Sequence, residues 1–418
     1  MHSSVSIQDN QRIMEDVPLR AIVQQYGSPC YAYSKKAISE NFLDYQQALG
    51  SRDHLICYAV KSNSNIAVLQ TLANLGAGFD IVSMGELERV LMAGGDPAKV
   101  VYSGVAKTAA EMRRALEVGI HCFNVESESE LKLLNKTAAE INQIAPVSLR
   151  VNPDVDAKTH PYISTGLKEN KFGIDISRAH EVYQQAAQME NISVVGVDCH
   201  IGSQLTDITP FIDAMQHLLV LVDRLADSGI KLKHIDIGGG LGVRYQNENV
   251  PSLASYMQAL APLLKDRNET LVMEPGRSIT ANAGILLTQV QVIKKNGDKK
   301  FAIVDAAMND MLRPALYDAW MDIYAVELAT ESEAADYDVV GPVCETGDFL
   351  GKDRTLTIAE GDYLYLSSAG AYGFTMSSNY NSRPRVAEVM IDGNKTHLIR
   401  ARETIEDLVR GEQLIKEQ

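Results

Sequence analysis

The sequence predicts a (β/α)8 barrel followed by an antiparallel β domain that also takes up a strand near the N-terminus. Eight short apolar runs alternate with helical patterns between residues 55 and 276, and their continuous Val/Ile/Leu character is typical of parallel strands buried on both faces. After Ile279 the pattern changes to alternation by two around tight turns. Eight strand–helix units are the number that a closed barrel needs, and a doubly wound open sheet is the alternative.

The eight predicted barrel strands each lead into a turn and then a helical pattern. They cover residues 55–62, 77–83, 100–104, 122–127, 147–153, 194–202, 234–240 and 270–276. The clearest helical pattern is "ITPFIDAMQHLLVLVDRLADSG", in which apolar residues recur at i, i+3, i+4 and i+7. Several of these patterns end in glycine, which is common at helix C-termini.

The β domain is predicted from two hairpin signals and further alternating runs. An Asn-Gly turn interrupts "ILLTQVQVIKKNGDKKFAIVDA", and a Gly-Asn turn interrupts "RVAEVMIDGNKTHLIRARE". The runs "DYDVVGP" and "GDYLYLSS" lie between them, and "SPCYAYS" near the N-terminus is an isolated strand that we expect to join this sheet. The predicted domains are an N-terminal segment (1–36), the barrel (37–279) and the β domain (280–418).

Composition and charge exclude several classes of function. The 418-residue chain has a net charge of −15, which would repel the phosphates of nucleic acids and anionic lipids, and it has no apolar run long enough to span a membrane. The five cysteines lack C-x-x-C spacing, so we expect neither a disulfide framework nor a structural metal site. The first residues lack the apolar region of a secretion signal, and the expected location is the cytoplasm.

Polar residues at the ends of the predicted strands are the candidates for the active site, because strand C-termini face the active site of such barrels. Lys61 ends the first strand and could either reach for solvent or form an imine. His200 ends the sixth and could be a core histidine or lie against a planar cofactor. Glycines 238–240 end the seventh, where they serve either a tight turn or an anion.

Glu274 is a carboxylate at the end of an otherwise apolar strand, "LVMEP", and a buried carboxylate needs a cationic or hydrogen-bonding partner. Arg277 is one candidate partner and a protonated pyridine nitrogen is another. An imine-forming lysine, a phosphate cradle and an acid for a ring nitrogen together indicate pyridoxal 5′-phosphate (PLP). A phosphosugar aldolase would also use the lysine and the glycines, but it would not need Glu274.

Cys344 lies in "VGPVCETGDFL", directly before Glu345 and close to Asp348. Neighbouring negative charge disfavours a thiolate, so this position suits a nucleophile poorly. The interpretation that the local sequence favours is a small core residue in a loop.

The ordered motifs resemble one family. "YAVKSN", "HIGSQ", "DIGGGLG", "EPGR", "MNDMLRPALY", "CETGD" and "SSAGAYGF" are together similar to the diaminopimelate decarboxylases, PLP enzymes with an alanine-racemase-like barrel. The resemblance extends from about Ser28 to about Arg402, and "NPDVDAKTHPYISTGLKENKFGI" (152–174) adds to it.

The resemblance implies a role for each matching residue. The cofactor would be attached to Lys61 and held by Asp80, His200, Ser203, Gly239, Gly240, Glu274, Gly276, Arg277 and Tyr372. The substrate would be held by Arg277, Arg313, Tyr317, Glu345 and Tyr372, with Cys344 as proton donor.

The implied reaction converts meso-2,6-diaminopimelate to L-lysine and CO2, the last step of lysine biosynthesis, in a homodimer whose active sites lie at the subunit interface. Arg313 with Glu345 would recognise the distal carboxylate and ammonium, whereas a distal arginine would repel the single ammonium of ornithine or lysine. The alternatives are a decarboxylase for ornithine, arginine or carboxynorspermidine, an amino-acid racemase, and a PLP carrier without activity.

Overall fold

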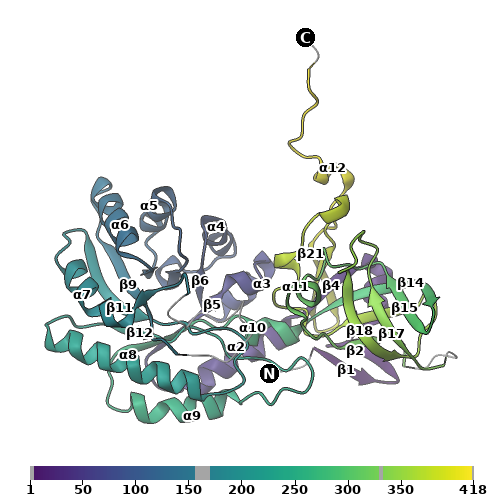
Figure 1. The fold of residues 1–418 in the computed structure, drawn as a ribbon, viewed down its shortest axis with the longest axis horizontal. Coiled ribbons are helices and arrows are strands. Elements are labelled where there is room, and N and C mark those ends of the chain that lie inside the picture. The colour runs from purple at the N-terminus through teal and green to yellow at the C-terminus, as the bar shows by residue number, and fades with distance from the viewer. Residues whose placement is uncertain (1–3, 156–169, 329–332, 417–418) are drawn as a thin grey trace. The chain divides into compact units, whose positions relative to one another are not determined.

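The computed structural model describes residues 4–155, 170–328 and 333–416, so most of the motif at 152–174 lies outside the described residues. The chain divides into two compact units, which are drawn as ribbons in Figure 1. Ser39–Ile279 forms one unit, and Met1–Ile38 together with Thr280–Gln418 forms the other.

The first unit is a closed parallel barrel. Its strands run in the order β9-β11-β12-β13-β5-β6-β7-β8, and β8 pairs with β9 to close the ring, which confirms the predicted barrel and excludes the open sheet. A two-residue strand, β10 (Ile174–Asp175), pairs beside β9 and was not predicted. The eight barrel strands are β5 (His54–Ala59), β6 (Gly78–Ile81), β7 (Val100–Tyr102), β8 (Cys122–Val125), β9 (Ala145–Asn152), β11 (Ile192–Asp198), β12 (His234–Asp236) and β13 (Thr270–Met273).

Helices connect successive barrel strands and lie outside them in Figure 1. Several of them begin after a side-chain cap: Ser83, Thr108 and Ser127 each accept a hydrogen bond from a backbone N–H of the first turn. The connecting helices are α3 (Ile66–Asn74), α4 (Met84–Met92), α5 (Ala109–Val118), α6 (Glu128–Glu140), α7 (Ile176–Ala187), α8 (Thr209–Asp227) and α9 (Leu253–Leu264), whereas α2 (Lys35–Leu49) precedes β5 and α10 (Arg277–Thr280) follows β13.

The second unit is built on a sheet with the order β18-β17-β15-β14-β4-β20-β21, in which β19 also pairs with β14 and β16 pairs with β19. The N-terminal strand β4 pairs with both β14 and β20, which confirms its predicted place. These strands are β4 (Cys30–Ser34), β14 (Gly284–Asn296), β15 (Lys299–Val304), β16 (Ile323–Ala325), β17 (Ala335–Val340), β18 (Phe349–Leu356), β19 (Tyr363–Leu366), β20 (Ala387–Asp392) and β21 (Lys395–Arg400).

This sheet is mixed, whereas the sequence predicted an antiparallel one. Both predicted hairpins form, with Gly297 and Gly393 at positive φ in their turns. However, β4 pairs parallel with β20, and β15 pairs parallel with β17. No short turn joins either of these pairs along the chain, so nothing imposes the antiparallel arrangement of a hairpin.

The remaining short elements complete the second unit. Met14, Leu19 and Ile22 are buried in one core cluster with Ile285 and Val389 of the sheet, so the N-terminal segment packs on that sheet. The elements are β1 (Val5–Gln8), β2 (Gln11–Met14), β3 (Val17–Pro18), α1 (Leu19–Tyr26), α11 (Arg313–Tyr317) and α12 (Ile405–Leu408). Among the helices of the described residues, none combines the length and the apolar character needed to cross a membrane.

Candidate active site

Lys61 and Asp80 meet at the C-terminal ends of neighbouring barrel strands. Lys61 lies in a short 3-10 turn (Val60–Ser62) directly after β5, and Asp80 lies on β6 opposite Ala59. The Lys61 Nζ donates a hydrogen bond to Oδ2 of Asp80. The Asp80 side chain is fully buried and 35% of the Lys61 side chain is exposed, so the amine stands between the barrel interior and solvent.

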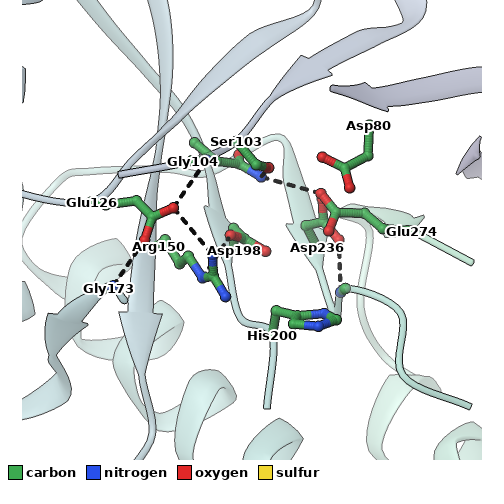
Figure 2. Close-up of polar contacts among 12 residues, drawn as sticks. Asp80, Ser103, Gly104, Glu126, Arg150, Gly173, Asp198, His200, Asp236 and Glu274 are labelled. Atoms are coloured by element: carbon green, nitrogen blue, oxygen red, sulfur yellow. Dashed lines mark hydrogen bonds and ion pairs between the residues drawn. The ribbon is translucent and has the colours of Figure 1, made fainter. Parts of the chain in front are cut away.

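Three buried acids gather at the ends of β11, β12 and β13. Asp198 pairs in register with Asp236, and Glu274 directly follows β13; the carboxyl oxygens of the three lie within 4.8 Å of one another. Glu274 Oε1 accepts a hydrogen bond from Asn124 Nδ2 at 3.3 Å, and Asp236 Oδ1 accepts one from the backbone of Gly238 at 2.8 Å. Figure 2 shows these side chains converging beside Asp80.

Burial and mutual repulsion keep protons on this acidic cluster. Burial raises the pKa of Glu274 well above its usual range, and the charges of Asp236 and Asp80 raise it further. Burial also raises the pKa of Asp236 to about 7, and burial with the nearby Asp236 raises that of Asp198. Carboxyl groups of this cluster therefore retain protons at neutral pH.

Arg150 on β9 is a buried cation beside this cluster. Its Nη1 lies 3.1 Å from Oε1 of Glu126, and its Nε lies 3.9 Å from Oδ2 of Asp198 (Figure 2). Glu126 also accepts hydrogen bonds from the backbone N–H groups of Gly104 and Gly173, each at 3.0 Å. The Arg150–Glu126 pair is thus fixed by the backbone, as a buried ion pair requires.

His200 lies just past β11 and is held in its neutral form. Burial lowers its pKa well below the usual value, and the positive charges of Arg150 and Lys61 lower it further. The backbone N–H of Gly239 donates to Nδ1 of His200 at 3.2 Å, so a proton on this ring belongs on Nε2.

The glycines after β12 are required by close backbone contacts. A Cβ on Gly239 would lie 2.2 Å from the carbonyl oxygen of Glu274, and one on Gly240 would lie 2.5 Å from that of Gly202. Gly240 also has a φ of +106°, which L side chains rarely adopt. Any side chain here would force the loops after β11, β12 and β13 apart.

Arg277 is buried at the start of α10, where it contacts two hydroxyl groups. Its Nη1 donates to the hydroxyl of Tyr245 at 2.7 Å, and its Nη2 donates to Oγ of Ser203 at 3.0 Å. Gly276 packs against the end of β5, because a Cβ there would lie 3.0 Å from that of Ala59. One region of the barrel mouth is thus lined by the Arg277 guanidinium, the Ser203 hydroxyl and glycine backbone.

Cys344 and Glu345 are exposed in the loop between β17 and β18 of the second unit. The other four cysteines are buried, so Cys344 is not the small core residue that was one interpretation. The backbone N–H of Cys344 donates to Oδ1 of Asn381 at 2.7 Å, and the Tyr380 hydroxyl donates to Oε2 of Glu345 at 3.1 Å.

Asp348 does not accompany Cys344 at the surface. It is buried, and its carboxylate accepts hydrogen bonds from the backbone of Met308 at 2.6 Å and of Val343 at 2.9 Å. Asp348 therefore shapes the loop, and Glu345 is the acid exposed next to the thiol.

The other predicted residues of the second unit are on α11 and in the "SSAGAYGF" loop. Arg313 is buried, with Nη1 3.4 Å from Sδ of Met321, and Tyr317 is half-buried. Tyr372 has a φ of +54°, a strained conformation for a residue with a side chain. The neighbouring Gly370 allows this tight loop, since a Cβ there would collide with the Thr280 carbonyl.

Several residues of these sites were missed by the sequence analysis. Asp198 and Asp236 end apolar strands, as Glu274 does, and the same argument from burial would have found them. Tyr245 lies in a loop and Tyr380 begins a short 3-10 turn, and the sequence gives no signal of what either side chain contacts.

Comparisons with known proteins agree with this architecture. The family model described as "Pyridoxal-dependent decarboxylase, pyridoxal binding domain" matches residues 35–281. The chain is 60% identical to the diaminopimelate decarboxylase of Pseudomonas aeruginosa over 98% of this chain and 99% of that protein. It is 58% identical to that of Vibrio cholerae, with 98% of each chain covered.

Solved structures give the same result. The diaminopimelate decarboxylase of Helicobacter pylori complexed with L-lysine has a TM-score of 0.90 at 45% identity, covering 94% of this chain and 98% of that one. The enzyme of M. jannaschii, also in complex with L-lysine, has a TM-score of 0.94 at 38% identity, covering 99% and 98%. A lysine/ornithine decarboxylase of Vibrio vulnificus, at 22% identity and a TM-score of 0.79, shares the fold.

Proposed function

The chain belongs to the diaminopimelate decarboxylases of the pyridoxal-dependent decarboxylase family, and from this premise we propose which of its residues perform the reaction. The reaction removes one carboxyl group of meso-2,6-diaminopimelate as CO2 and leaves L-lysine. The observation that carries the assignment of the barrel site is the cluster of buried carboxyl groups of Asp198, Asp236 and Glu274 beside the Lys61–Asp80 pair.

The barrel residues fit PLP at both of its ends. Among the described residues, Oδ1 of Asp80, Oδ1 of Asp198 and Oδ2 of Asp236 are buried without a hydrogen-bond partner, which suits a protonated ring nitrogen nearby. Arg277 and the bare glycine backbone suit the phosphate. The residues that would hold PLP are Lys61, Asp80, His200, Ser203, Gly239, Gly240, Glu274, Gly276, Arg277 and Tyr372.

When bound, PLP supplies an electron sink for the pair of electrons that the departing CO2 leaves behind. Glu274 contributes a proton held inside the barrel, where it keeps the ring nitrogen protonated. Asp80 positions the amine of Lys61 at the end of β5. Because His200 is neutral, it would pack an uncharged ring against the cofactor. Arg277 would then be the cation that binds the phosphate.

Residues of the second unit bind the substrate in this proposal. Arg313 and Tyr317 hold the distal carboxylate, and Glu345 holds the distal ammonium. Arg277 and Tyr372 contact substrate as well as cofactor. The far end of diaminopimelate carries a carboxylate and an ammonium group, which Arg313 and Glu345 would bind. Ornithine has only the ammonium there, so the unpaired charge of Arg313 would disfavour it.

Cys344 is the proton donor. After CO2 has left, the thiol proton moves to the α-carbon, and solvent later restores the thiol. The exposure of Cys344 supports this role, since the proton must be replaced after every turnover. General acids of this kind contribute about 10²–10⁴-fold to a rate.

We propose a homodimer in which the Cys344 loop of each subunit enters the site of its partner. The support is that the Cys344 thiol and the Glu345 carboxylate lie exposed on a single chain, in a loop held by the hydrogen bonds from the Cys344 backbone N–H to Asn381 and from Tyr380 to Glu345. We also propose that the protein works in the cytoplasm, because all five cysteines are free thiols, as a reducing compartment favours.

Release of CO2 from meso-diaminopimelate, with PLP added and with ornithine and arginine assayed in parallel, tests the proposed function. We expect rapid release from diaminopimelate and slow release from the other two. Equal turnover of ornithine and diaminopimelate would contradict the proposed recognition by Arg313 and Glu345.

A further inference from the structure

Three potential metal ligands meet at the end of the barrel opposite the active site. His121 directly precedes β8, Cys122 begins β8, and His234 begins β12, so all three lie where strands start. Their donor atoms lie within 4.8 Å of one another, and Sγ of Cys122 is 3.9 Å from Nε2 of His234. The sequence separates His234 from the other two by more than a hundred residues, so no spacing motif announces the cluster.

His121 presents a ring nitrogen that no other group uses. Its Nε2 is buried without a hydrogen-bond partner among the described residues. Buried polar atoms in folded proteins are normally satisfied, so a ligand bound at this nitrogen would supply the missing partner.

Gly196 on β11 makes room for the cluster. It pairs in register with His234, and a Cβ at Gly196 would lie 2.0 Å from Nε2 of His234. Even alanine at this position would occupy the space in which the donor nitrogen of His234 lies.

We propose that His121, Cys122 and His234 bind one Zn²⁺ ion, with water as the fourth ligand. Binding replaces the proton of the Cys122 thiol, which passes to solvent, and both histidines bind as neutral rings. Two imidazoles and a thiolate favour Zn²⁺, whereas the oxygen-only group of Asp198, Asp236 and Glu274 suits harder cations.

The ion would join strands that do not touch. In the barrel order, β9 and β11 lie between β8 and β12, so a metal shared by Cys122 and His234 bridges across two intervening strands. Such a bridge stabilises the barrel and takes no part in the reaction at the other end. The adjacent Lys233 is exposed, so solvent screens the repulsion between its positive charge and the ion.

The test is Zn²⁺ binding to the full-length, PLP-loaded protein carrying Cys344→Ser, which removes the exposed thiol. Competition with a chromophoric chelator measures stoichiometry and affinity, and Co²⁺ reports thiolate ligation through its sulfur-to-metal absorption band. We expect one ion per chain, with affinity at least tenfold weaker and the Co²⁺ band lost in Cys122→Ser.

Two further variants keep the outcome clear. Cys57→Ser removes another buried thiol of the same core cluster as Cys122, and it should leave binding and the Co²⁺ band unchanged. His121→Gln alters a half-buried side chain, so it tests ligation with little effect on folding, and it should weaken binding. Absence of binding to the parent protein, or equal binding by Cys122→Ser, would overturn the proposal.

Discussion

The hydroxyl of Tyr380 donates a hydrogen bond to Oε2 of Glu345, with 3.1 Å between the two oxygens. Both side chains are exposed, and Asn381, next to this tyrosine, accepts a hydrogen bond from the backbone of Cys344. One short segment therefore holds both the proposed proton donor and the proposed ammonium-binding acid.

Tyr380→Phe should raise the KM for diaminopimelate by roughly 3- to 10-fold, which corresponds to the loss of about one hydrogen bond. Affinity for PLP should not change, because the tyrosine is proposed to position Glu345 only. Tyr324→Phe is the matched control, since Tyr324 is also exposed and donates to a carboxylate, that of Asp322, at 3.2 Å. Steady-state kinetics measure the KM of each variant. An equal KM in both variants would show that Tyr380 does not contribute to substrate binding.

Cys344→Ala should retain PLP and lose about 10²–10⁴-fold in kcat, because the variant lacks the general acid. Cofactor absorbance measures the first property and CO2 release the second. Thr346→Ala, an exposed change in the same loop, should have nearly the activity of the parent. Near-normal turnover in Cys344→Ala would end the assignment of this thiol as proton donor.

Mixing two inactive variants, Lys61→Ala and Cys344→Ala, should restore activity if each site takes its thiol from the partner. Random exchange of subunits gives one intact site in half of the dimers, so the mixture should reach roughly a quarter of parent activity. The mixture is assayed after subunit exchange, with each variant alone as control. If the thiol serves the site of its own subunit, mixing restores nothing.

Arg313→Ala should lower kcat/KM for diaminopimelate by roughly 10- to 100-fold, the cost of losing a charge-assisted contact to the distal carboxylate. PLP affinity should change far less. The control is Arg354→Ala, which removes another buried arginine of the same unit without a proposed substrate role. Comparable losses in both variants would mean that Arg313 acts through stability.

The features best predicted from the sequence are those that depend on burial alone. The barrel strands are apolar because both faces are covered, and Lys61 and Glu274 were recognised because charge at the end of such a strand needs a reason. The parallel pairing of β4 with β20 could not be predicted, since it depends on contacts between distant segments. For the same reason, the approach of Cys122 to His234 depends on strand register across a closed barrel.

Asp236→Asn should stabilise the PLP-free protein more at about pH 8 than at about pH 5. Burial raises the pKa of Asp236 to about 7 from the usual 3.8 of an aspartate, so between these values the unfolded chain releases a proton that the folded chain retains. The unfolding free energy of the parent therefore falls as pH rises through this range, by roughly 2–3 kcal/mol between the two conditions, and asparagine has no such dependence. Urea unfolding of both proteins at each pH measures the difference.

Asp213→Asn, an exposed change on α8, is the control and should change the unfolding free energy equally at both pH values. An equal effect of Asp236→Asn at both would mean that the buried acidic cluster is ionised throughout.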